Sequence, residues 1–456
     1  MNTLVILEII FSGIFAVVLI DRLYTLVLSI RRRAKAHVAA TLTEYPKVAV
    51  QLPMYNEWAV YERVIECACQ LDWPKDRLII QVLDDSTDED IKPKINALVA
   101  AKAAEGYRIT VTRRPDRRGF KAGSLQRAMS LLGGIPYVVI FDADFEPGPD
   151  FLRRTVPLLE GDASIAFVQA RWTFSNENVS SLTKLQKVAL DFHHRAEQQG
   201  RSNAQTFLNF NGSAGLWRVS TILDSGGWSG ETLVEDMDLS LRAFIRGQVG
   251  IYLSDLECLN ELPETDRTYR TQQRRWLAGP MHLATLQFKA IWGSGTLSLR
   301  HKIAASWFFL RYAYSAFNIA YLLIVLPLLI AYGSTFAVSL TLLSIGAVIP
   351  FLMNLRYWYM VVPFALGWDY SYFKLRSAIE GILRTEGSRA WTVTERAATT
   401  RVSKTGGLNR EEALIGAGAA LLAAGGLVYG NWMLTAYAAA IAVIYLSLAA
   451  GTPSKI

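Results

Sequence analysis

Apolar residues are distributed along the chain in two different patterns. Near the N-terminus and after residue 300 they form long, nearly unbroken runs, whereas between residues 45 and 260 they form short runs rich in Val and Ile. Runs of about 20 apolar residues can cross a lipid bilayer as helices, while short runs bounded by polar residues are typical of buried strands. The pattern therefore predicts a soluble domain combined with membrane segments.

The long apolar runs predict five membrane-spanning helices. The first lies in residues 1–30, and the arginines that follow it directly predict a retained anchor whose N-terminus is outside. Two more spans are predicted in residues 304–355, where Pro327 and Pro350 imply kinks, and two in residues 412–450. Turns are expected at Gly333–Ser334 and Gly430–Asn431. The chain is thus expected to be a multi-pass protein of a plasma or inner membrane.

Two further stretches connect these spans to the soluble part. Residues 281–303 are expected to lie at the membrane surface. Residues 356–411 are net basic and contain an amphipathic helix. The apolar face of that helix is formed by Tyr372, Leu375, Ile379, Ile382 and Leu383. Because Lys and Arg gather on the cytoplasmic side of membranes, the basic connection and the soluble domain are both predicted to be cytoplasmic.

In the predicted soluble domain, residues 45–280, strands alternate with helices. The predicted strands span 47–56, 77–86, 107–114, 137–145 and 165–174, and the predicted helices span 59–71, 119–132, 181–201 and 234–247. This alternation is typical of an open, mainly parallel sheet covered by helices. Ligands of such sheets bind beyond the C-terminal ends of the strands.

Charge and cysteine usage argue against nucleic-acid binding and against cysteine chemistry. The net charge of +7 is consistent with nucleic-acid binding, but Lys and Arg gather beside the apolar runs, where a membrane surface accounts for them, so no nucleic-acid partner is expected. The cysteines Cys67, Cys69 and Cys258 form no CxxC pair and are expected to be reduced, packed side chains without a chemical role.

Carboxylates stand at the ends of two predicted strands. Asp142 and Asp144 in FDADF fall on the same side of an extended segment, because side chains alternate along a strand. Two carboxylates placed in this way can share a divalent cation, Mg²⁺ or Mn²⁺, although aspartates at strand ends are also common turn formers. Asp84 and Asp85 repeat this placement on a neighbouring strand. Like charges so close would repel unless a cation or a hydrogen-bonding ligand lay between them.

A third acidic group, VEDMDL, opens a predicted helix. Its acids Glu235, Asp236 and Asp238 are favoured there by the helix dipole alone. One of them can instead act as a general base that deprotonates a sugar hydroxyl as it attacks an anomeric carbon, which inverts the configuration of that carbon. The arginines after the third strand are most simply a solvated or lipid-facing surface, so only Lys121 and Gly123 of that loop are expected to contact a ligand.

The stretch TQQRRWLAGP, residues 271–280, lies just before the chain turns apolar. Guanidinium groups bind phosphate oxygens in pairs, amides recognise hydroxyls, and an indole offers a flat apolar face. This combination suits a phosphorylated, hydroxyl-rich ligand such as a nucleotide-sugar. A basic and aromatic anchor at the membrane surface explains the same ten residues equally well.

In this order, LDDS, KAG, FDADF, VED and QQRRW closely resemble the family 2 processive membrane glycosyltransferases of the cellulose and hyaluronan synthase type. The longer stretches VQLPMYNE, QVLDDSTDED, FNGSAGLWR, VEDMDL and WTVTE are most similar to plant cellulose-synthase-like A and C proteins. The resemblance covers residues 47–395. It implies an α/β domain of the GT-A, Rossmann-like type on the cytosolic face, beside a bundle of transmembrane helices that forms a channel.

The resemblance also implies a role for each matching residue. The donor would be bound by Asp84, Asp85, Lys121, Gly123, Asp142, Gln272 and Arg275. The acceptor would be bound by Asn211, Gly212 and Trp276. Asp142 and Asp144 would hold Mg²⁺ or Mn²⁺, and Asp236 would be the catalytic base. Val234 departs from the family pattern, which has threonine there, so the hydroxyl assigned to that position is missing.

These expectations predict an inverting, processive β-glycosyltransferase that builds a β-1,4-linked mannan or glucan from GDP-mannose or UDP-glucose. Two alternatives stay open. A non-processive enzyme that adds one sugar to a membrane lipid would use the same donor. A transporter or scaffold would bind nucleotide-sugar without a catalytic base, but ionisable residues near the predicted spans, such as Arg311, are scarce for a carrier.

Overall fold

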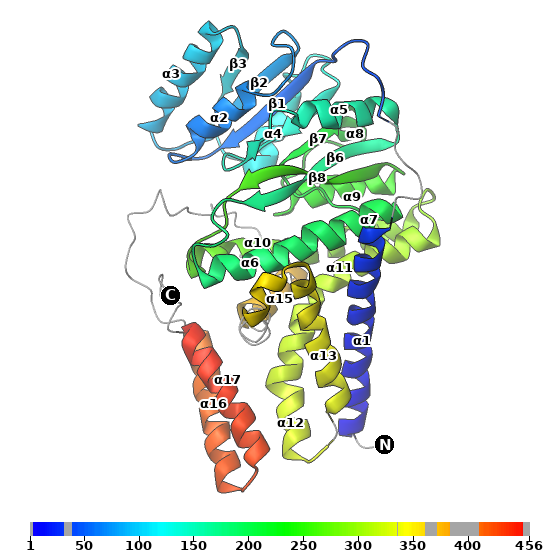
Figure 1. Cartoon of the computed structure of the whole chain (residues 1–456), viewed down its shortest axis with the longest axis vertical. Helices are drawn as coiled ribbons and strands as arrows, with labels where there is room; N and C mark the ends of the chain where they lie inside the picture. The colour runs from blue at the N-terminus through cyan, green and yellow to red at the C-terminus, as the bar shows by residue number, and fades with distance from the viewer. Residues whose placement is uncertain (1–2, 32–38, 335, 361–371, 384–409, 450–456) are drawn as a thin grey trace.

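The computed structural model describes residues 3–31, 39–334, 336–360, 372–383 and 410–449. Within them, an α/β domain lies at one end of the molecule and a group of apolar helices at the other (Figure 1). Helix α1 (Thr3–Ile30) extends from the free end of that group up to the α/β domain. The WTVTE motif lies outside these residues.

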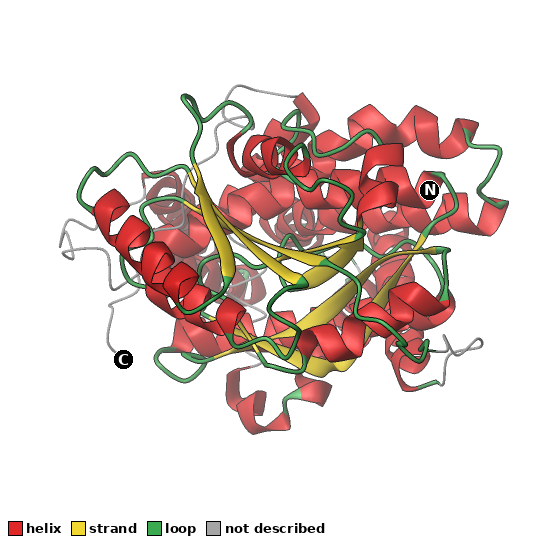
Figure 2. Cartoon of the chain, turned by 90° about the horizontal axis from the view of Figure 1, so that it is seen from above, coloured by secondary structure: helices red, strands yellow, loops and turns green. Residues whose placement is uncertain are grey.

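A single eight-stranded sheet forms the centre of the α/β domain, with helices on both of its faces (Figure 2). Its strands are β1 (Val48–Met54), β2 (Leu78–Asp84), β3 (Arg108–Thr112), β4 (Tyr137–Ile140), β5 (Glu146–Pro147), β6 (Ile165–Phe174), β7 (Gly215–Arg218) and β8 (Val249–Asn260), in the order β3-β2-β1-β4-β7-β6-β8-β5. The first four strands pair in parallel, as predicted. β7 is antiparallel to both of its neighbours and was not among the predicted strands.

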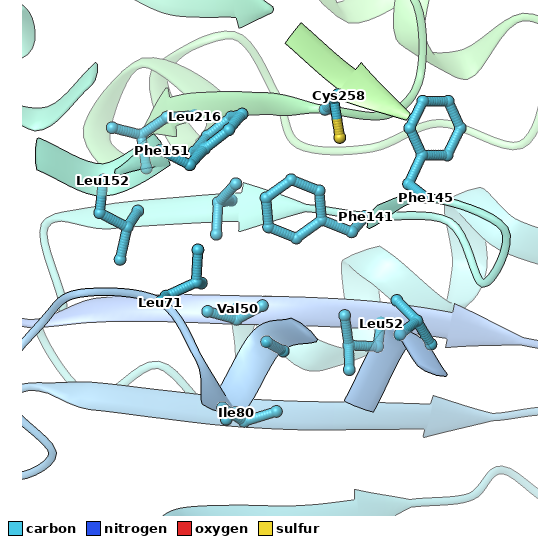
Figure 3. Packing of buried hydrophobic residues seen from close by; sticks show 14 of the residues in the cluster. Val50, Leu52, Leu71, Ile80, Phe141, Phe145, Phe151, Leu152, Leu216 and Cys258 are labelled. Atoms are coloured by element: carbon cyan, nitrogen blue, oxygen red, sulfur yellow. The ribbon is translucent and has the colours of Figure 1, made fainter. Parts of the chain in front are cut away.

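Alternation along the strands divides the side chains between two cores. On β1, Val48 and Val50 belong to the first core and Ala49 to the second. The first core includes residues of α2 (Tyr61–Cys69), α3 (Ile91–Ala104) and α5 (Phe151–Gly161), and the second includes residues of α4 (Phe120–Met129), α8 (Val219–Asp224) and α9 (Glu235–Ile245). Figure 3 shows part of the first core, with Val50 and Phe141 from the sheet region and Leu152 from α5. Each fully buried aliphatic or aromatic side chain contributes roughly 1.5–3 kcal/mol, so the cores hold each strand in one register.

The register brings the ends of the parallel strands together. Met54 at the end of β1 lies beside Asp84 at the end of β2, and Gln51 of β1 lies beside Ile140 at the end of β4. Because these strands are parallel, their C-terminal ends share one edge of the sheet. The carboxylates that follow β2 and β4 therefore lie at the same edge.

Two long helical segments lie between the sheet and the apolar helices (Figure 1). The first runs through α6 (Ser181–Phe192), the π-helical turn η1 (His193–Gln198) and α7 (Gln199–Ala204), which confirms the helix predicted over 181–201. The second is α10 (Asp266–Gly293), which passes without a break through residue 280, where the sequence placed the end of the soluble domain. The residues TQQRRWLAGP therefore lie on a continuous helix.

The predicted amphipathic helix is confirmed as α15 (Tyr372–Leu383), which packs closely on α10. A Cβ atom at Gly381 would lie 2.4 Å from the carbonyl oxygen of Ala278, so only glycine allows the two backbones to approach this far. Ile379, Ile382 and Leu383, which belong to the predicted apolar face, remain exposed.

The apolar helices match the predicted spans in position but differ from them in length. By length and composition, α1 is the one helix in the described residues that is able to cross a bilayer unaided, and Leu299–Tyr314 with Phe317–Ala331 is a second span if this pair, bent by 40°, is taken as one. The other apolar helices, Ala337–Met353, Glu412–Val428 and Trp432–Ser447, are shorter. The number of five spans therefore stays a prediction.

Both prolines in the predicted spans lie next to irregular helix. The elements are α11 (Leu299–Ala320), the π-helical turn η2 (Tyr321–Val325), α12 (Leu326–Ala331), α13 (Ala337–Val348), the 3₁₀ turns η3 (Ile349–Met353) and η4 (Leu355–Met360), α16 (Arg410–Val428) and α17 (Trp432–Ala449). Pro327 is the second residue of α12, which begins where η2 ends, and Pro350 lies inside η3. Proline lacks the N–H group that an α-helix needs, and these turns accommodate the missing hydrogen bond.

Candidate active site

A cavity of about 460 Å³ opens at the edge of the sheet where β1, β2 and β4 end. All but two of the predicted site residues line it, namely Asp85, Lys121, Asp142, Asp144, Asn211, Gly212, Asp236, Gln272, Arg275 and Trp276. They come from segments nearly 200 residues apart in the chain, as the span from Asp85 to Trp276 shows. The exceptions are Asp84 and Gly123, which do not line the cavity.

The two aspartates at the end of β2 face in different directions. Asp84 is buried, and its Oδ2 accepts a hydrogen bond of 2.7 Å from Nε of Arg113. Asp85 lines the cavity, and its Oδ1 accepts a hydrogen bond of 2.9 Å from Nε of Arg114. Each of the two carboxylates is thus paired with its own arginine. The prediction of a solvated surface is therefore wrong for Arg114, whose side chain is 9% exposed, whereas Arg113 stays exposed.

Lys121 and Asp142 form an ion pair on the cavity wall. Nζ of Lys121 lies 2.5 Å from Oδ1 of Asp142 and donates a hydrogen bond of 2.9 Å to the carbonyl oxygen of Gly212. Burial by itself lowers the pKa of Lys121, but Asp142 and the acids of α9 outweigh it and raise this pKa. The ammonium group therefore stays charged.

Gly123 belongs to the turn that orients Lys121, and it does not line the cavity. A Cβ atom at Gly123 would lie 2.0 Å from the carbonyl oxygen of Arg118. The loop before α4 also contains Gly119, whose φ is +70°, in the left-handed region that favours glycine. The glycine of KAG is thus required by the backbone that brings the loop back against its own helix.

Asp236 lies in the first turn of α9, and its Oδ1 accepts a hydrogen bond of 2.8 Å from the N–H of Met237. Burial, reinforced by the charge of Glu235, raises the pKa of Asp236 to about 7, although Lys121 acts in the opposite direction. Burial also raises the pKa of Glu235. A carboxylate with a pKa near 7 is suited to accept a proton during a reaction and release it afterwards.

The loop that carries Asn211 and Gly212 lies against Asp236. Gly212 has a φ of +88°, and a Cβ atom there would lie 2.8 Å from Oδ2 of Asp236. Glycine therefore allows both the backbone conformation and the close approach. Nε2 of Gln198 donates a hydrogen bond of 2.7 Å to Oδ1 of Asn211, which orients the Asn211 amide at the cavity wall.

Helix α10 presents Gln272, Arg275 and Trp276 to the cavity, because residues three and four positions apart share a helix face. Burial lowers the pKa of Arg275, although nearby carboxylates act in the opposite direction. Arg274 instead faces α15, where its Nε donates a hydrogen bond of 2.9 Å to Oε2 of Glu380. The two arginines of QQRRW thus face two different neighbours.

Several residues that line the cavity were not predicted as site residues. They are Tyr55, Glu57, Arg117, Trp172, Asn176, Asn260, Glu261 and Glu264. Tyr55 and Glu57 follow β1 directly, so the rule that ligands bind at strand ends already pointed to them. The guanidinium of Arg117 lies 3.4 Å from the centroid of the Tyr55 ring, a cation–π contact that depends on how the loop before α4 folds back.

Asp142 and Asp144 both line the cavity, as the predicted divalent-cation site requires. Within the part of the chain that the structure describes, no group of three or more His, Cys, Asp or Glu side chains is placed to hold a metal ion. Mg²⁺ is usually bound through one or two carboxylates, and waters and phosphate oxygens of a ligand complete its shell; Mn²⁺ also prefers oxygen ligands. These carboxylates therefore fit a cation that binds together with a diphosphate.

Two family models match the chain over the segments that form this cavity. Glycosyl transferase family group 2 matches residues 137–371, and Glycosyl transferase family 2 matches residues 49–218. The first match alone extends over more than half of the chain. The chain belongs to glycosyl transferase family group 2. The two family models together thus cover the segments from β1 to α10 that form the cavity walls.

Plant relatives agree with this assignment and confirm the predicted resemblance to cellulose-synthase-like proteins. Probable glucomannan 4-beta-mannosyltransferase 10 of Arabidopsis thaliana is 36% identical over 428 residues, which are 88% of this chain and 77% of the relative. Glucomannan 4-beta-mannosyltransferase 2 of the same plant is 48% identical over 243 residues, 53% of this chain and 46% of the relative. The more similar alignment therefore spans less than half of the relative's length.

A solved structure confirms the fold of the α/β domain in this family member. The mannosyltransferase from Pyrobaculum calidifontis in complex with GDP-Man and Mn²⁺ superposes with a TM-score of 0.60 at 19% identity, over 84% of this chain and 100% of that chain. At this identity the likeness concerns the fold. The GT-A prediction is confirmed, while the predicted membrane bundle is supported only as far as the one or two helices of spanning length.

Proposed function

We propose that this protein is an inverting hexosyltransferase that extends a β-1,4-linked mannan or glucan. The observation that carries the proposal is that Asp236, with a pKa near 7, lines the same cavity as the cationic groups that suit a diphosphate. The acceptor hydroxyl gives its proton to Asp236 as its oxygen attacks the anomeric carbon. The bond from that carbon to the diphosphate oxygen breaks, and the nucleoside diphosphate leaves from the opposite face, which inverts the configuration.

We assign the donor diphosphate to the wall that carries Lys121, Gln272 and Arg275. Their N–H groups and positive charges stabilise the negative charge that develops on the leaving group. Mg²⁺ or Mn²⁺ bound at Asp142 and Asp144 would supply further neutralisation of the diphosphate. This assignment is supported by the common cavity of all five side chains.

The nucleoside part of the donor is assigned to the end of β2, where Asp85 lines the cavity. Asp84 and Gly123, which lie behind this wall, are assigned to its support. The names of the relatives favour mannose as the transferred sugar. We therefore assign GDP-mannose as the donor, with UDP-glucose as the second choice. The same names favour a β-1,4-linked product.

We assign the acceptor to Trp276, with Asn211 and Gly212 on the same cavity wall. An indole stacks on the apolar face of a sugar ring, and its helix α10 lies next to the apolar helices (Figure 1). An acceptor at this position would therefore be close to the membrane. We further propose that the enzyme is multi-pass and processive, that its catalytic domain is cytoplasmic, and that the growing chain leaves through a channel between the apolar helices.

A donor panel tests this function. The purified full chain is incubated with labelled GDP-mannose, GDP-glucose, UDP-glucose, UDP-galactose or UDP-N-acetylglucosamine, each with Mg²⁺ or Mn²⁺, and the products are digested with linkage-specific glycosidases. We expect a polymer from GDP-mannose that β-1,4-mannanase degrades. Label found only in the organic phase would instead indicate a glycolipid product, and donor binding without any transfer would indicate a binding protein.

A further inference from the structure

The ammonium group of Lys121 lies among the carboxylates of the cavity. Its side chain is only 15% exposed, and its Nζ lies 2.5 Å from Oδ1 of Asp142. Glu235 and Asp236 are also near enough to stabilise its charge. A positive charge thus already occupies the most acidic part of the site.

Three features of the chain hold the ammonium in this position. Lys121 stands in the first turn of α4, two residues after the left-handed Gly119. Its Nζ donates to the carbonyl oxygen of Gly212, at 2.9 Å, and Gly212 in turn packs against Asp236. A buried cation is stable only when it is paired, so the ion pair with Asp142 is the favoured arrangement of the ligand-free protein.

Asp142 therefore has two competing partners. The proposed function assigns this carboxylate to a divalent cation, yet one of its oxygens contacts the ammonium of Lys121. A divalent cation shared by Asp142 and Asp144 would lie within a few ångströms of that ammonium. Like charges at such a distance repel strongly when water is largely excluded, so the two cations cannot occupy the same carboxylate oxygen together.

We propose that Lys121 is a positioning residue that occupies the cation site of the free protein and leaves Asp142 only when a divalent cation binds together with a nucleoside diphosphate. The diphosphate supplies the negative charge with which the displaced ammonium then pairs. This inference rests on the proposed function, because it requires a diphosphate ligand. It follows that nucleotide strengthens metal binding and that metal strengthens nucleotide binding by the same factor.

Mn²⁺ binding to the purified full chain tests this proposal without any measurement of activity. Free Mn²⁺ is followed by electron paramagnetic resonance, with and without GDP. We expect Lys121→Met to bind Mn²⁺ without GDP at least about tenfold more tightly than the wild type, because the competing charge is gone while the chain length is similar. GDP should tighten Mn²⁺ binding to the wild type far more than to this variant.

Two controls separate the ion pair from a general effect of charge. Lys121→Arg keeps the cation and should bind Mn²⁺ as weakly as the wild type. Arg117→Met removes a cation from the same cavity, but one that lies over Tyr55, and should leave the Mn²⁺ affinity of the free protein unchanged. An equal gain in Arg117→Met and Lys121→Met would overturn the proposal.

The proposal is also overturned if Lys121→Met binds Mn²⁺ no more tightly than the wild type. Circular dichroism checks that the variant is folded, and Lys121→Gln provides the same comparison if it is not. The wild type alone provides a third test, since the proposal is contradicted if its Mn²⁺ affinity is the same with and without GDP. These results are separate from the proposed function, because a protein that forms polymer can fail the Mn²⁺ test, and a protein that forms none can pass it.

Discussion

Asp236 combines the properties that a general base needs, since it is buried, lies in the cavity and has a pKa near 7. Asp236→Asn keeps the shape of the side chain and removes its ability to accept a proton. We expect the rate of sugar transfer to fall by about 10²–10⁴-fold. Binding of GDP, measured by calorimetry, should change little, and a variant that retains wild-type transfer would rule out Asp236 as the base.

The pH dependence of transfer provides a second test at this residue. The base must be ionised before the acceptor binds, so kcat/KM should rise about tenfold per pH unit below 7 and level off above it.

The same group affects the pH dependence of stability. The carboxyl pKa of Asp236 is raised from 3.8 to about 7, so between these pH values the native protein keeps a proton that the unfolded chain has lost. The contribution of this group to stability therefore falls as the pH rises through that window. Asp236→Asn should lose this part of the pH dependence of Tm, whereas identical profiles in both proteins would contradict the assigned pKa.

At the scale of elements, the position of α10 depends on its contact with the residue before α9. A Cβ atom at Gly279 would lie 2.5 Å from Cγ1 of Val234, so the valine that replaces the family's threonine packs directly on α10. We expect Gly279→Ala to cost about 1–3 kcal/mol by overpacking and to reduce transfer by shifting Trp276. Thermal unfolding and initial rates measure the two effects.

A matched control lies on the same helix. A Cβ atom at Gly293, the last residue of α10, meets nothing within 4 Å, so Gly293→Ala should be harmless. The double variant Gly279→Ala with Val234→Ala should recover most of the loss, because the smaller side chain makes room for the added methyl group. Absence of recovery would show that the contact with Val234 does not position α10.

At the scale of the whole molecule, the turn after α12, the turn between α16 and α17, and the N-terminus lie at the end opposite the α/β domain (Figure 1). The helix α10 is also tied to α16, since Nη1 and Nη2 of Arg270 donate to Glu412 at 2.8 and 2.9 Å. We predict that these turns are outside and that the α/β domain is cytoplasmic.

Cysteine labelling in intact cells tests this topology. A membrane-impermeant maleimide should label Ser334→Cys and Asn431→Cys from outside, because both positions lie at the turns. Of the native cysteines, which all belong to the α/β domain, Cys67 is partly exposed and should react only after the cells are opened. Cys69 and Cys258 are buried and should react only after the protein is unfolded. Labelling of both turns only in opened cells would contradict the predicted orientation.

The residues that repeat with a clear period were the ones whose structure could be predicted. Short runs rich in Val and Ile predicted β1 and β4 of the sheet, whereas the helix that places Gln272, Arg275 and Trp276 on one face was not predicted. Local periodicity is sufficient here, because it reflects which side of an element is buried. The lengths of the apolar helices were less predictable, since proline, π-helical and 3₁₀ turns divide them.

The sequence by itself determined the GT-A fold, the edge of the sheet where the site lies and the family to which the chain belongs, because these depend on local patterns and ordered motifs. Only the tertiary structure decided that Asp84 is buried while Asp85 faces the cavity, and that Gly123 supports a turn. It also showed the ammonium of Lys121 on Asp142. The physical reason is that burial, ion pairing and pKa depend on neighbours that are distant in the chain, and no local spacing records them.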